Sequence, residues 1–451
     1  MRPAMAPAEI RVRRPNVIFI LADDLGYGDL SCFGQKKFST PNIDRLAAEG
    51  MKFTRHYCGC TVCAPSRSTV MTGLHTGHTP IRGNKQVGDG QVPLPQGTET
   101  LAACLKRAGY ATGCFGKWGL GFPGSVGDPV NVGFDTFFGY NCQTEAHSYY
   151  PERLWSDRQE VKLDGQTYSP PLIMGEALKF VREHAGKKPF FAWLTVTIPH
   201  AAMSVPPELH APFRKQFPEF EGTRARYDKT REDESPASAF PAMIGVLDRQ
   251  VGEVLALVKA LGIEEDTLVL FASDNGPHKE GGHQPDFWGS SGGLRGYKRD
   301  LYDGGIRTPL LARWPGTIRP GSESAHLSAF WDLMPTLCEL AGKKPACNMD
   351  GLSFASTLLG REGQPQHSGL YWEFHEQGGK RAYLKGSLKA IQLNVDKVPE
   401  GPVEVYDLAA DPAEVHNIAD RHGLFVDEAR RAFVAQHSRS ETFPWKWEKT
   451  K

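Results

Sequence analysis

The amino-acid sequence predicts an α/β fold, with a large, mostly parallel mixed sheet between layers of helices and a small antiparallel sheet near the C-terminus. Patterns typical of buried strands alternate with patterns typical of amphipathic helices over most of the chain. Hydrophobic residues make up 40% of the 451 residues, which is enough for a large core. Repeated β-α-β units of this kind pair their strands in parallel and place helices on both faces of the sheet.

The first half of the chain begins this alternation. Thr40-Pro41 is typical of a helix start, because proline fits the first helical position, where its missing N–H is not needed. Gly109 is typical of a helix end, because glycine readily adopts the left-handed conformation. In chain order we expect a buried strand over 17–21, a short helix from Pro41 to Gly50, a second helix over 101–108 and a strand over 110–115.

The middle of the chain adds a strand, a long helix and another strand. Residues 190–198 have the composition of a buried strand. Apolar side chains then recur at i, i+3, i+4 and i+7 from Ile244 to Leu261, which predicts a helix that ends at Gly262. An acidic turn follows this helix and leads into a further apolar strand over 267–272.

Two other regions depart from this pattern. The highly charged segment 223–238 predicts a solvated surface insertion. Toward the C-terminus the pattern changes to short segments separated by turns, such as 381–393 and 403–408, which predict the small antiparallel sheet. We therefore expect one large domain over residues 1–365 and a small α+β domain over 366–451.

The overall composition excludes two classes of partner. Lys and Arg number 52 and Asp and Glu also number 52, which argues against a protein that binds nucleic acid through bulk positive charge. No apolar run approaches the ~18 residues that a membrane span needs.

The opening segment, Met1 to Pro15, carries several Arg residues but no apolar signal core. We expect a periplasmic or secreted protein if a signal was removed from this chain, and a cytoplasmic protein otherwise.

The cysteine content does not predict a disulfide framework. The chain has nine cysteines, and this odd number leaves at least one without a partner. Cys58, Cys60 and Cys63 form a C-x-C-x2-C cluster, a spacing that is compatible with a zinc knuckle. A second Cys/His cluster at metal-binding spacing does not follow nearby, so zinc is disfavoured.

Pairs of oxygen ligands follow two of the predicted strands. Asp23-Asp24 follows the first strand, and Asp274-Asn275 follows the strand at 267–272. In open α/β sheets, ligands bind at the carboxyl ends of the strands. Three carboxylates and an amide oxygen that meet there suit a hard divalent cation such as calcium or magnesium. Taken singly, each pair is also typical of an ordinary turn.

A third motif places a cysteine at the start of a helix. The segment from Cys63 to Gly73 (CAPSRSTVMTG) has Pro65 in its first turn and glycine at its end. The free N–H groups and the macrodipole at such a helix start favour negative charge. Arg67, four residues after Cys63, lies on the same helix face and can reach an anion held there.

These motifs together resemble the type I sulfatases of the alkaline-phosphatase superfamily. Cys63-Ala-Pro-Ser-Arg67 followed by Thr72-Gly73 matches that family's C-x-P-S-R-x4-T-G signature at every fixed position. The resemblance covers nearly the whole chain and implies an alkaline-phosphatase-like sheet. Its other motifs are Pro15-Asn16 through Asp23-Asp24, Gly116-Lys117-Trp118, Pro199-His200, Ser273-Asp274-Asn275-Gly276, Leu294-Arg295-Gly296-x-Lys298, Gly304-Gly305-x-Arg307-x-Pro309, Glu404-x-Tyr406-Asp407-Leu408 and Asp411-Pro412-x-Glu414-x-x-Asn417.

The resemblance implies a modified nucleophile and a metal. A maturation enzyme reads the signature and oxidises the cysteine to formylglycine, whose hydrated aldehyde attacks sulfur through one oxygen. The second hydroxyl then collapses to the aldehyde and expels sulfate, which splits a difficult hydrolysis into two steps. The implied calcium ligands are Asp23, Asp24, Asp274, Asn275 and the modified Cys63.

The resemblance also implies roles for four basic residues. Arg67, Lys117 and Lys298 would offset charge on the equatorial sulfate oxygens. His200 would hold the substrate oxygen or protonate the leaving alcohol.

One position departs from the family pattern. The usual motif is G-K-W-H-L-G, whereas this chain has Gly119 in place of the histidine, which commonly contacts the gem-diol and assists sulfate release. A subset of bacterial glycan sulfatases is similar here, with G-K-W-G-L-G followed by C-Q-x-x-A-H-x-Y-Y-P, as in Cys142–Pro151. We hypothesise that His147 or Gln143 enters the site and substitutes in part. Alternatively, His147 is only a loop residue.

The expected function is hydrolysis of sulfate monoesters on sulfated carbohydrates. His278, the pair Phe287-Trp288 and the segment 149–155 place aromatic and polar side chains on loops, which suits a sugar ring, although surface aromatics also serve packing alone. The expected substrate-binding residues are Gln143, His147, His200, His278 and Lys298. Two alternatives stay open: a phosphonate monoester or phosphodiester hydrolase of the same superfamily, and a binding protein for sulfated glycans in which the cysteine stays unconverted.

Overall fold

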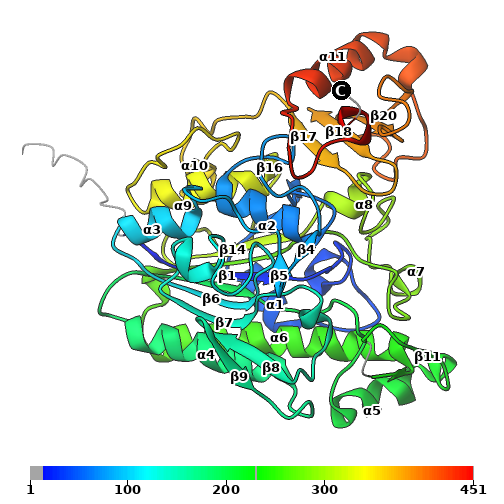
Figure 1. Ribbon diagram of the computed structural model, residues 1–451. Helices are drawn as coiled ribbons and strands as arrows, with labels where there is room; N and C mark the ends of the chain where they lie inside the picture. Colours follow the sequence, from blue (N-terminus) through cyan, green and yellow to red (C-terminus); the bar gives the residue numbers. More distant parts are fainter. Residues whose placement is uncertain (1–13, 229–230, 450–451) are drawn as a thin grey trace, which may run out of the picture.

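The computed structural model describes residues 14–228 and 231–449. Within them a ten-stranded sheet has the order β15-β2-β14-β13-β1-β10-β6-β7-β8-β9 (Figure 1). Its central strands β13, β1, β10, β6 and β7 are parallel, and β14 and β8 join them in antiparallel orientation. The predicted mixed, mostly parallel sheet is therefore confirmed. The strands are β1 (Asn16–Ala22), β2 (Met51–Phe53), β6 (Ala111–Lys117), β7 (Thr136–Tyr140), β8 (Arg153–Ser156), β9 (Gln159–Lys162), β10 (Phe190–Thr195), β13 (Thr267–Ser273), β14 (Leu310–Arg313) and β15 (Ser322–Ser324).

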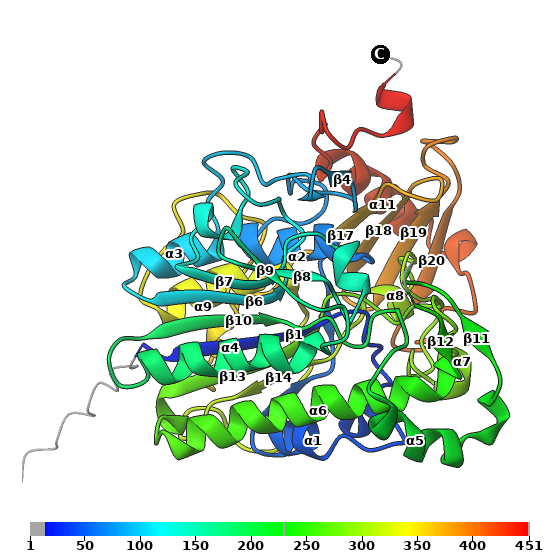
Figure 2. The same cartoon turned by 60° about the horizontal axis from the view of Figure 1, so that its bottom comes forward.

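Helices cover both faces of this sheet, as Figure 2 shows. Alternate side chains of β1 enter two different cores, with Phe19 on one face and Ile20 on the other. Such a strand needs an almost continuous apolar sequence, because neither of its faces meets water. One face packs against α2 (Cys63–Thr72), α3 (Leu101–Arg107) and α9 (Leu333–Leu340), and the other against α1 (Pro41–Ala48), α4 (Ser169–His184) and α6 (Pro236–Ala260).

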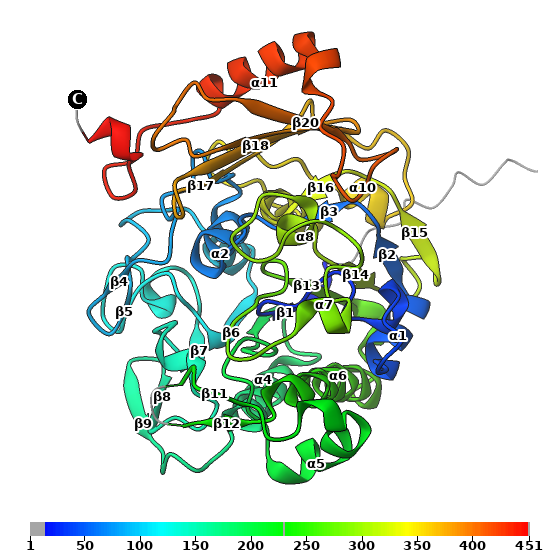
Figure 3. The same ribbon diagram turned by 90° about the vertical axis from the view of Figure 1, so that its right-hand side faces the viewer.

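The small antiparallel sheet near the C-terminus is also confirmed (Figure 3). Its strands are β17 (Leu370–Phe374), β18 (Lys380–Lys385), β19 (Leu388–Leu393) and β20 (Val403–Asp407), and α11 (Gly423–Ala435) covers its outer face. Side chains of its inner face, including Trp372 and Ile391, belong to the core of the large sheet. The division of the chain at residue 365 stays a prediction.

The C-terminal tail is tied to this sheet through a buried carboxylate. Glu373 of β17 lies 2.6 Å from His437 Nδ1, and Glu448 lies 3.0 Å from Nε2 of the same ring. Burial acts to lower the pKa of His437, but the two carboxylates outweigh it and raise that pKa above its ordinary value. The tail is thus held by a histidine between two acids.

Shorter helices and strands lie between these elements, besides several 3-10 helices of three residues each. The helices are α5 (Pro207–Gln216), α7 (Pro285–Trp288), α8 (Asp303–Ile306) and α10 (Ala355–Leu358), and the strands are β3 (His56–Tyr57), β4 (Gln86–Val87), β5 (Gly90–Gln91), β11 (Arg224–Ala225), β12 (Asp233–Glu234) and β16 (Ser328–Ala329). No helix within the described residues combines the length and the apolar character that a membrane crossing requires.

The prediction for the charged segment 223–238 was wrong in its second half. Helix α6 begins at Pro236, well before the apolar periodicity at Ile244, and Ser238 is fully buried. Asp233 is buried as well, and its carboxylate accepts a hydrogen bond of 3.1 Å from the backbone N–H of Met203. Residues 229–230 of this segment, and residues 1–13 of the opening segment, lie outside the described residues.

Candidate active site

Two pairs of polar residues meet at the carboxyl edge of the large sheet. Strands β1 and β13 are parallel and in register, so Asp23-Asp24 lies directly beside Asp274-Asn275. The backbone N–H of Asp24 donates to Asp274 Oδ1 over 3.1 Å, and the Asn275 amide donates to Asp24 Oδ1 over 2.6 Å. All four side chains are buried. The sequence prediction that these side chains lie together is confirmed.

Cys63 reaches the same point from the first residue of α2. Its thiol donates to Asp23 Oδ1 over 3.2 Å, and Lys117 Nζ at the end of β6 lies 3.4 Å from Sγ. Lys117 Nζ also lies 2.7 Å from Asp23 Oδ2. Burial raises the pKa of the Cys63 thiol well above its ordinary value, and Asp23 adds to this effect. An unmodified Cys63 is therefore a neutral thiol.

Arg67 lies one helical turn after Cys63 and is completely buried. Its Nε and Nη2 atoms lie 3.2 and 2.9 Å from Asp274 Oδ2, and Nη2 lies 3.5 Å from Asp23. Burial and the neighbouring Asp23 raise the pKa of Asp274 to about 7, against the opposing effect of Arg67. Burial also acts to raise the pKa of Asp23, but Lys117, the largest opposing influence, helps to lower it well below its usual value.

Lys298 and His200 both lie beside Asp24, the second residue of the acidic pair. Lys298 Nζ lies 2.7 Å from Asp24 Oδ2, 3.0 Å from His200 Nε2 and 3.4 Å from Glu280. The His200 Nδ1 atom lies 2.5 Å from the carbonyl oxygen of Ala201. This geometry fits an Nδ1–H donor, which leaves the Nε2 lone pair to face Lys298.

The donors at this edge are close enough to hold a metal ion. One ligand atom from each of Asp23, Asp24, Cys63 and His200 lies within 4.8 Å of the others. The Oδ1 atom of Asn275 is buried and has no hydrogen-bond partner in the part of the chain that the structure describes. A buried acceptor without a partner is costly, so this oxygen fits a cation ligand.

The predicted substrate-binding histidines surround His200. The His147 ring stacks on the His200 ring with centroids 4.8 Å apart, and Tyr227 lies 4.9 Å from His147. The His278 ring lies 5.8 Å from His200. However, His278 Nε2 contacts the Pro199 carbonyl oxygen and Nδ1 accepts a hydrogen bond from Glu280 N–H. His278 can contact a substrate only by giving up one of these partners.

Gln143 lies over the glycine that departs from the family motif. A β-carbon on Gly119 would lie 2.5 Å from Gln143 Nε2, and the φ angle of Gly119 is +79°. The Gln143 side chain is buried, and its Nε2 atom has no hydrogen-bond partner among the described residues. Gln143 thus fills the space at which a side chain of residue 119 would begin.

Sequence reasoning missed Tyr227 as part of this site. Its hydroxyl group donates to Glu280 Oε2 over 3.0 Å, and Glu280 in turn contacts Lys298. Tyr227 lies in the charged segment 223–238, for which the sequence predicts a surface insertion. An aromatic side chain among so many charged residues was the signal that could have identified it as part of a site. Ser66 was missed too, although its hydroxyl group donates to the Asp274 carbonyl oxygen over 2.5 Å.

The sequence matches two protein-family models. The sulfatase model matches residues 15–343, and the model for the C-terminal part of N-sulphoglucosamine sulphohydrolase matches residues 295–428. Human arylsulfatase A is 31% identical over 455 residues, which covers 92% of this chain and 85% of that protein. Rat N-acetylgalactosamine-6-sulfatase is 33% identical over 381 residues, which covers 76% of this chain and 66% of that protein.

A solved structure agrees with the sequence matches. The crystal structure of Ps i-CgsB in complex with k-i-k-neocarrahexaose has a TM-score of 0.79 at 25% identity, covering 97% of this chain and 96% of that chain. This chain therefore belongs to the sulfatase family and is a sulfuric ester hydrolase with an alkaline-phosphatase-like fold.

Proposed function

We propose that this sulfatase removes sulfate from sulfated carbohydrates by means of a formylglycine made from Cys63 and a calcium ion beside it. The observation that carries the proposal is the meeting of Cys63, Asp23 and Lys117 at the start of α2, with Sγ 3.2 and 3.4 Å from the two charged groups. A residue held between a carboxylate and an ammonium group at a helix start is positioned for anion chemistry.

The donor set supports calcium as the metal. Its members are Asp23, Asp24, Asp274, Asn275 and the oxygen that formylglycine would place at residue 63. Calcium prefers oxygen ligands, and the buried, unpartnered Asn275 Oδ1 is such a ligand. When bound, the ion would supply positive charge beside the sulfate group. The thiol of an unmodified Cys63 suits calcium poorly, so metal binding and maturation of this residue belong together in the proposal.

The basic residues around Cys63 would bind and orient the sulfate ester. Arg67, Lys117 and Lys298 approach from α2, β6 and the loop before α8, and each already pairs with a buried carboxylate. Preorganised charges of this kind stabilise charge that develops on the equatorial oxygens without reorganising. His200 presents Nε2 toward the same space, and with a proton on this nitrogen it would donate a hydrogen bond to the oxygen of the leaving alcohol.

Gln143 is our candidate for the role that is missing at Gly119. Its buried amide nitrogen has no partner among the described residues, so it is a donor available to the reacting group. A neutral amide can donate a hydrogen bond but cannot exchange a proton as an imidazole can. We therefore assign Gln143 the positioning part of that role and leave proton transfer to the histidines, His200 and His147.

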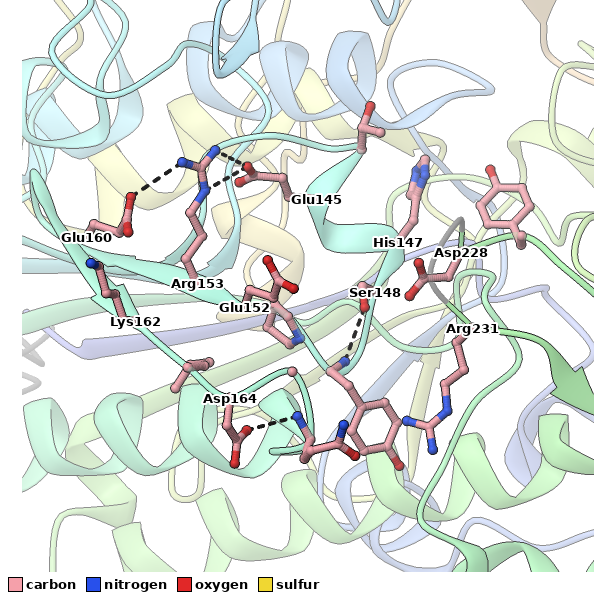
Figure 4. Close-up of a pocket in the computed structure, with 17 residues that line it drawn as sticks. Glu145, His147, Ser148, Glu152, Arg153, Glu160, Lys162, Asp164, Asp228 and Arg231 are labelled. Atoms are coloured by element: carbon pink, nitrogen blue, oxygen red, sulfur yellow. Dashed lines mark hydrogen bonds and ion pairs between the residues drawn. The ribbon is translucent and has the colours of Figure 1, made fainter.

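The cavity next to His147 supports a carbohydrate as the substrate. It measures about 1180 Å³, and the residues that line it include His147, Tyr150, Arg153, Tyr227 and Arg231 (Figure 4). His147 and Tyr227 also pack around His200, so the cavity adjoins the candidate sulfate site. Aromatic rings and polar side chains together suit sugar rings. Two similar proteins point the same way: one is named for a sulfated N-acetylgalactosamine, and the other is bound to k-i-k-neocarrahexaose.

Two measurements test the proposal on the mature protein. Peptide mass across Cys63 should show the aldehyde, whereas a fully retained thiol in a natively matured sample would favour the non-catalytic glycan binder. The purified protein should hydrolyse an aryl sulfate faster than an aryl phosphodiester, and the reverse order would favour the phosphonate or phosphodiester hydrolase. A panel of sulfated monosaccharides and oligosaccharides with defined sulfate positions then identifies the sugar.

A further inference from the structure

Two buried cysteines from distant parts of the sequence meet on one face of the large sheet. Cys104 belongs to α3 and Cys338 to α9, and these helices lie side by side (Figures 1 and 2). The two Sγ atoms are 2.7 Å apart, although 234 residues separate them in the sequence. Neither side chain is exposed to solvent by more than 1%.

This distance is shorter than an ordinary contact between two thiols. Non-bonded carbon atoms pack at about 3.5–4.0 Å, and sulfur is the larger atom. A disulfide bond measures about 2.05 Å. The packing of α3 against α9 therefore brings the two sulfur atoms inside contact distance, and a small further approach makes the bond.

We propose that Cys104 and Cys338 form a disulfide bond that links α3 to α9. The oxidant is a disulfide of the thiol–disulfide exchange class, either a small molecule or a protein. One thiolate of the pair attacks that disulfide and releases one thiol, and the other thiolate then attacks the sulfur of the first and releases a second. Two protein thiols lose two protons and two electrons in total, and the oxidant is reduced to two thiols.

The burial of the pair decides when the bond forms. Because both thiols are buried in the folded chain, exchange takes place before α3 and α9 close over them.

The bond would stabilise the packing around α2, the helix that begins with the candidate nucleophile Cys63. Helix α2 contacts both α3 and α9, so all three helices pack as a group on the same face of the sheet. A covalent link across this group restricts the unfolded chain and holds the two neighbours of α2 together. We therefore expect the oxidised protein to unfold at a higher temperature than the reduced protein.

The experiment compares the full chain exported to an oxidising compartment, the bacterial periplasm, with the same chain made in the reducing cytoplasm. Free thiols are blocked with iodoacetamide at cell lysis, and the peptides are analysed by mass spectrometry without reduction. We expect the peptides of Cys104 and Cys338 to be linked only in the exported sample. Cys114, buried in β6, serves as the control and should carry the alkyl group in both. Full alkylation of Cys104 and Cys338 in the exported protein would overturn the proposal.

Thermal unfolding with and without dithiothreitol provides a second test that does not depend on peptide recovery. The Tm of the exported wild-type protein should fall by several degrees on reduction. The double variant Cys104→Ala/Cys338→Ala should show no such fall, whereas the single variant Cys114→Ala should retain it. Equal dithiothreitol sensitivity of the double variant and the wild type would refute the link. Sulfatase turnover plays no part in either readout, so this inference stands or fails separately from the proposed function.

Discussion

The substitution Gly119→Ala tests the relation between Gly119 and Gln143 directly. The φ angle of +79° would cost an alanine about 1–2 kcal/mol of folding free energy, because its β-carbon approaches the following carbonyl oxygen. The new β-carbon would also lie 2.5 Å from Gln143 Nε2 and 3.1 Å from its Cγ atom. The Gln143 amide must therefore move away, which would remove its hydrogen bond to the reacting group.

The expected loss of turnover follows from the value of that hydrogen bond. A neutral hydrogen bond contributes about 0.5–1.5 kcal/mol net, so kcat for an aryl sulfate should fall by about 2- to 13-fold. Urea unfolding should show a loss of stability close to the backbone cost alone, because the end of a glutamine side chain can shift. Gln143→Ala should lower kcat by a similar factor, and adding Gly119→Ala to it should lower kcat no further.

Gly124 provides the matched control. Its φ angle is +77°, and none of the described atoms lies within 4 Å of the position of an added β-carbon. Gly124→Ala should therefore lose the same stability as Gly119→Ala but keep wild-type turnover. If the two alanine variants turned over equally, or if Gln143→Ala left kcat unchanged, the role assigned to Gln143 would be wrong.

Three further outcomes follow from the site and the tail. Asp274→Ala should abolish calcium binding, measured by titration calorimetry, together with turnover; retained calcium would mean that the metal site lies elsewhere. His200→Ala should abolish turnover and His147→Ala should reduce it in part; an intact His147→Ala enzyme would end the idea that His147 compensates for Gly119. The raised pKa of His437 predicts stability that is complete below its unfolded pKa of about 6.5 and declines as pH rises through the higher folded value. His437→Gln should remove this decline from urea-unfolding curves at a series of pH values, and an unchanged pH profile would show that the histidine is not charged in the fold.

The sequence predicted the parts of the fold in which the chemistry of one segment decides its structure. The apolar run around Val17 had to form a strand buried on both faces, and the segment after Cys63 had the start and end signals of a helix. Asp23 and Asp274 were predicted to meet because the carboxyl ends of parallel strands share one edge of the sheet.

The remaining features depend on contacts between distant segments, which a local pattern does not encode. The charged sequence before Ile244 contains the first turns of α6, since its polar groups find partners within the fold instead of in water. The position of Gln143 over Gly119 and the stacking of His147 on His200 likewise arise from the loop after β7, whose path no periodicity describes.

The burial of α2 bears on the order in which Cys63 is modified and the chain folds. All residues from Cys63 to Thr72 are buried in the folded chain. If Cys63 is converted to formylglycine as proposed, the maturation enzyme would have to reach this segment while it is still outside the core. Maturation and folding would then compete for the same newly made chain, and the active fraction would depend on the ratio of their rates. A variant that folds faster would then yield less active enzyme, even where it is the more stable protein.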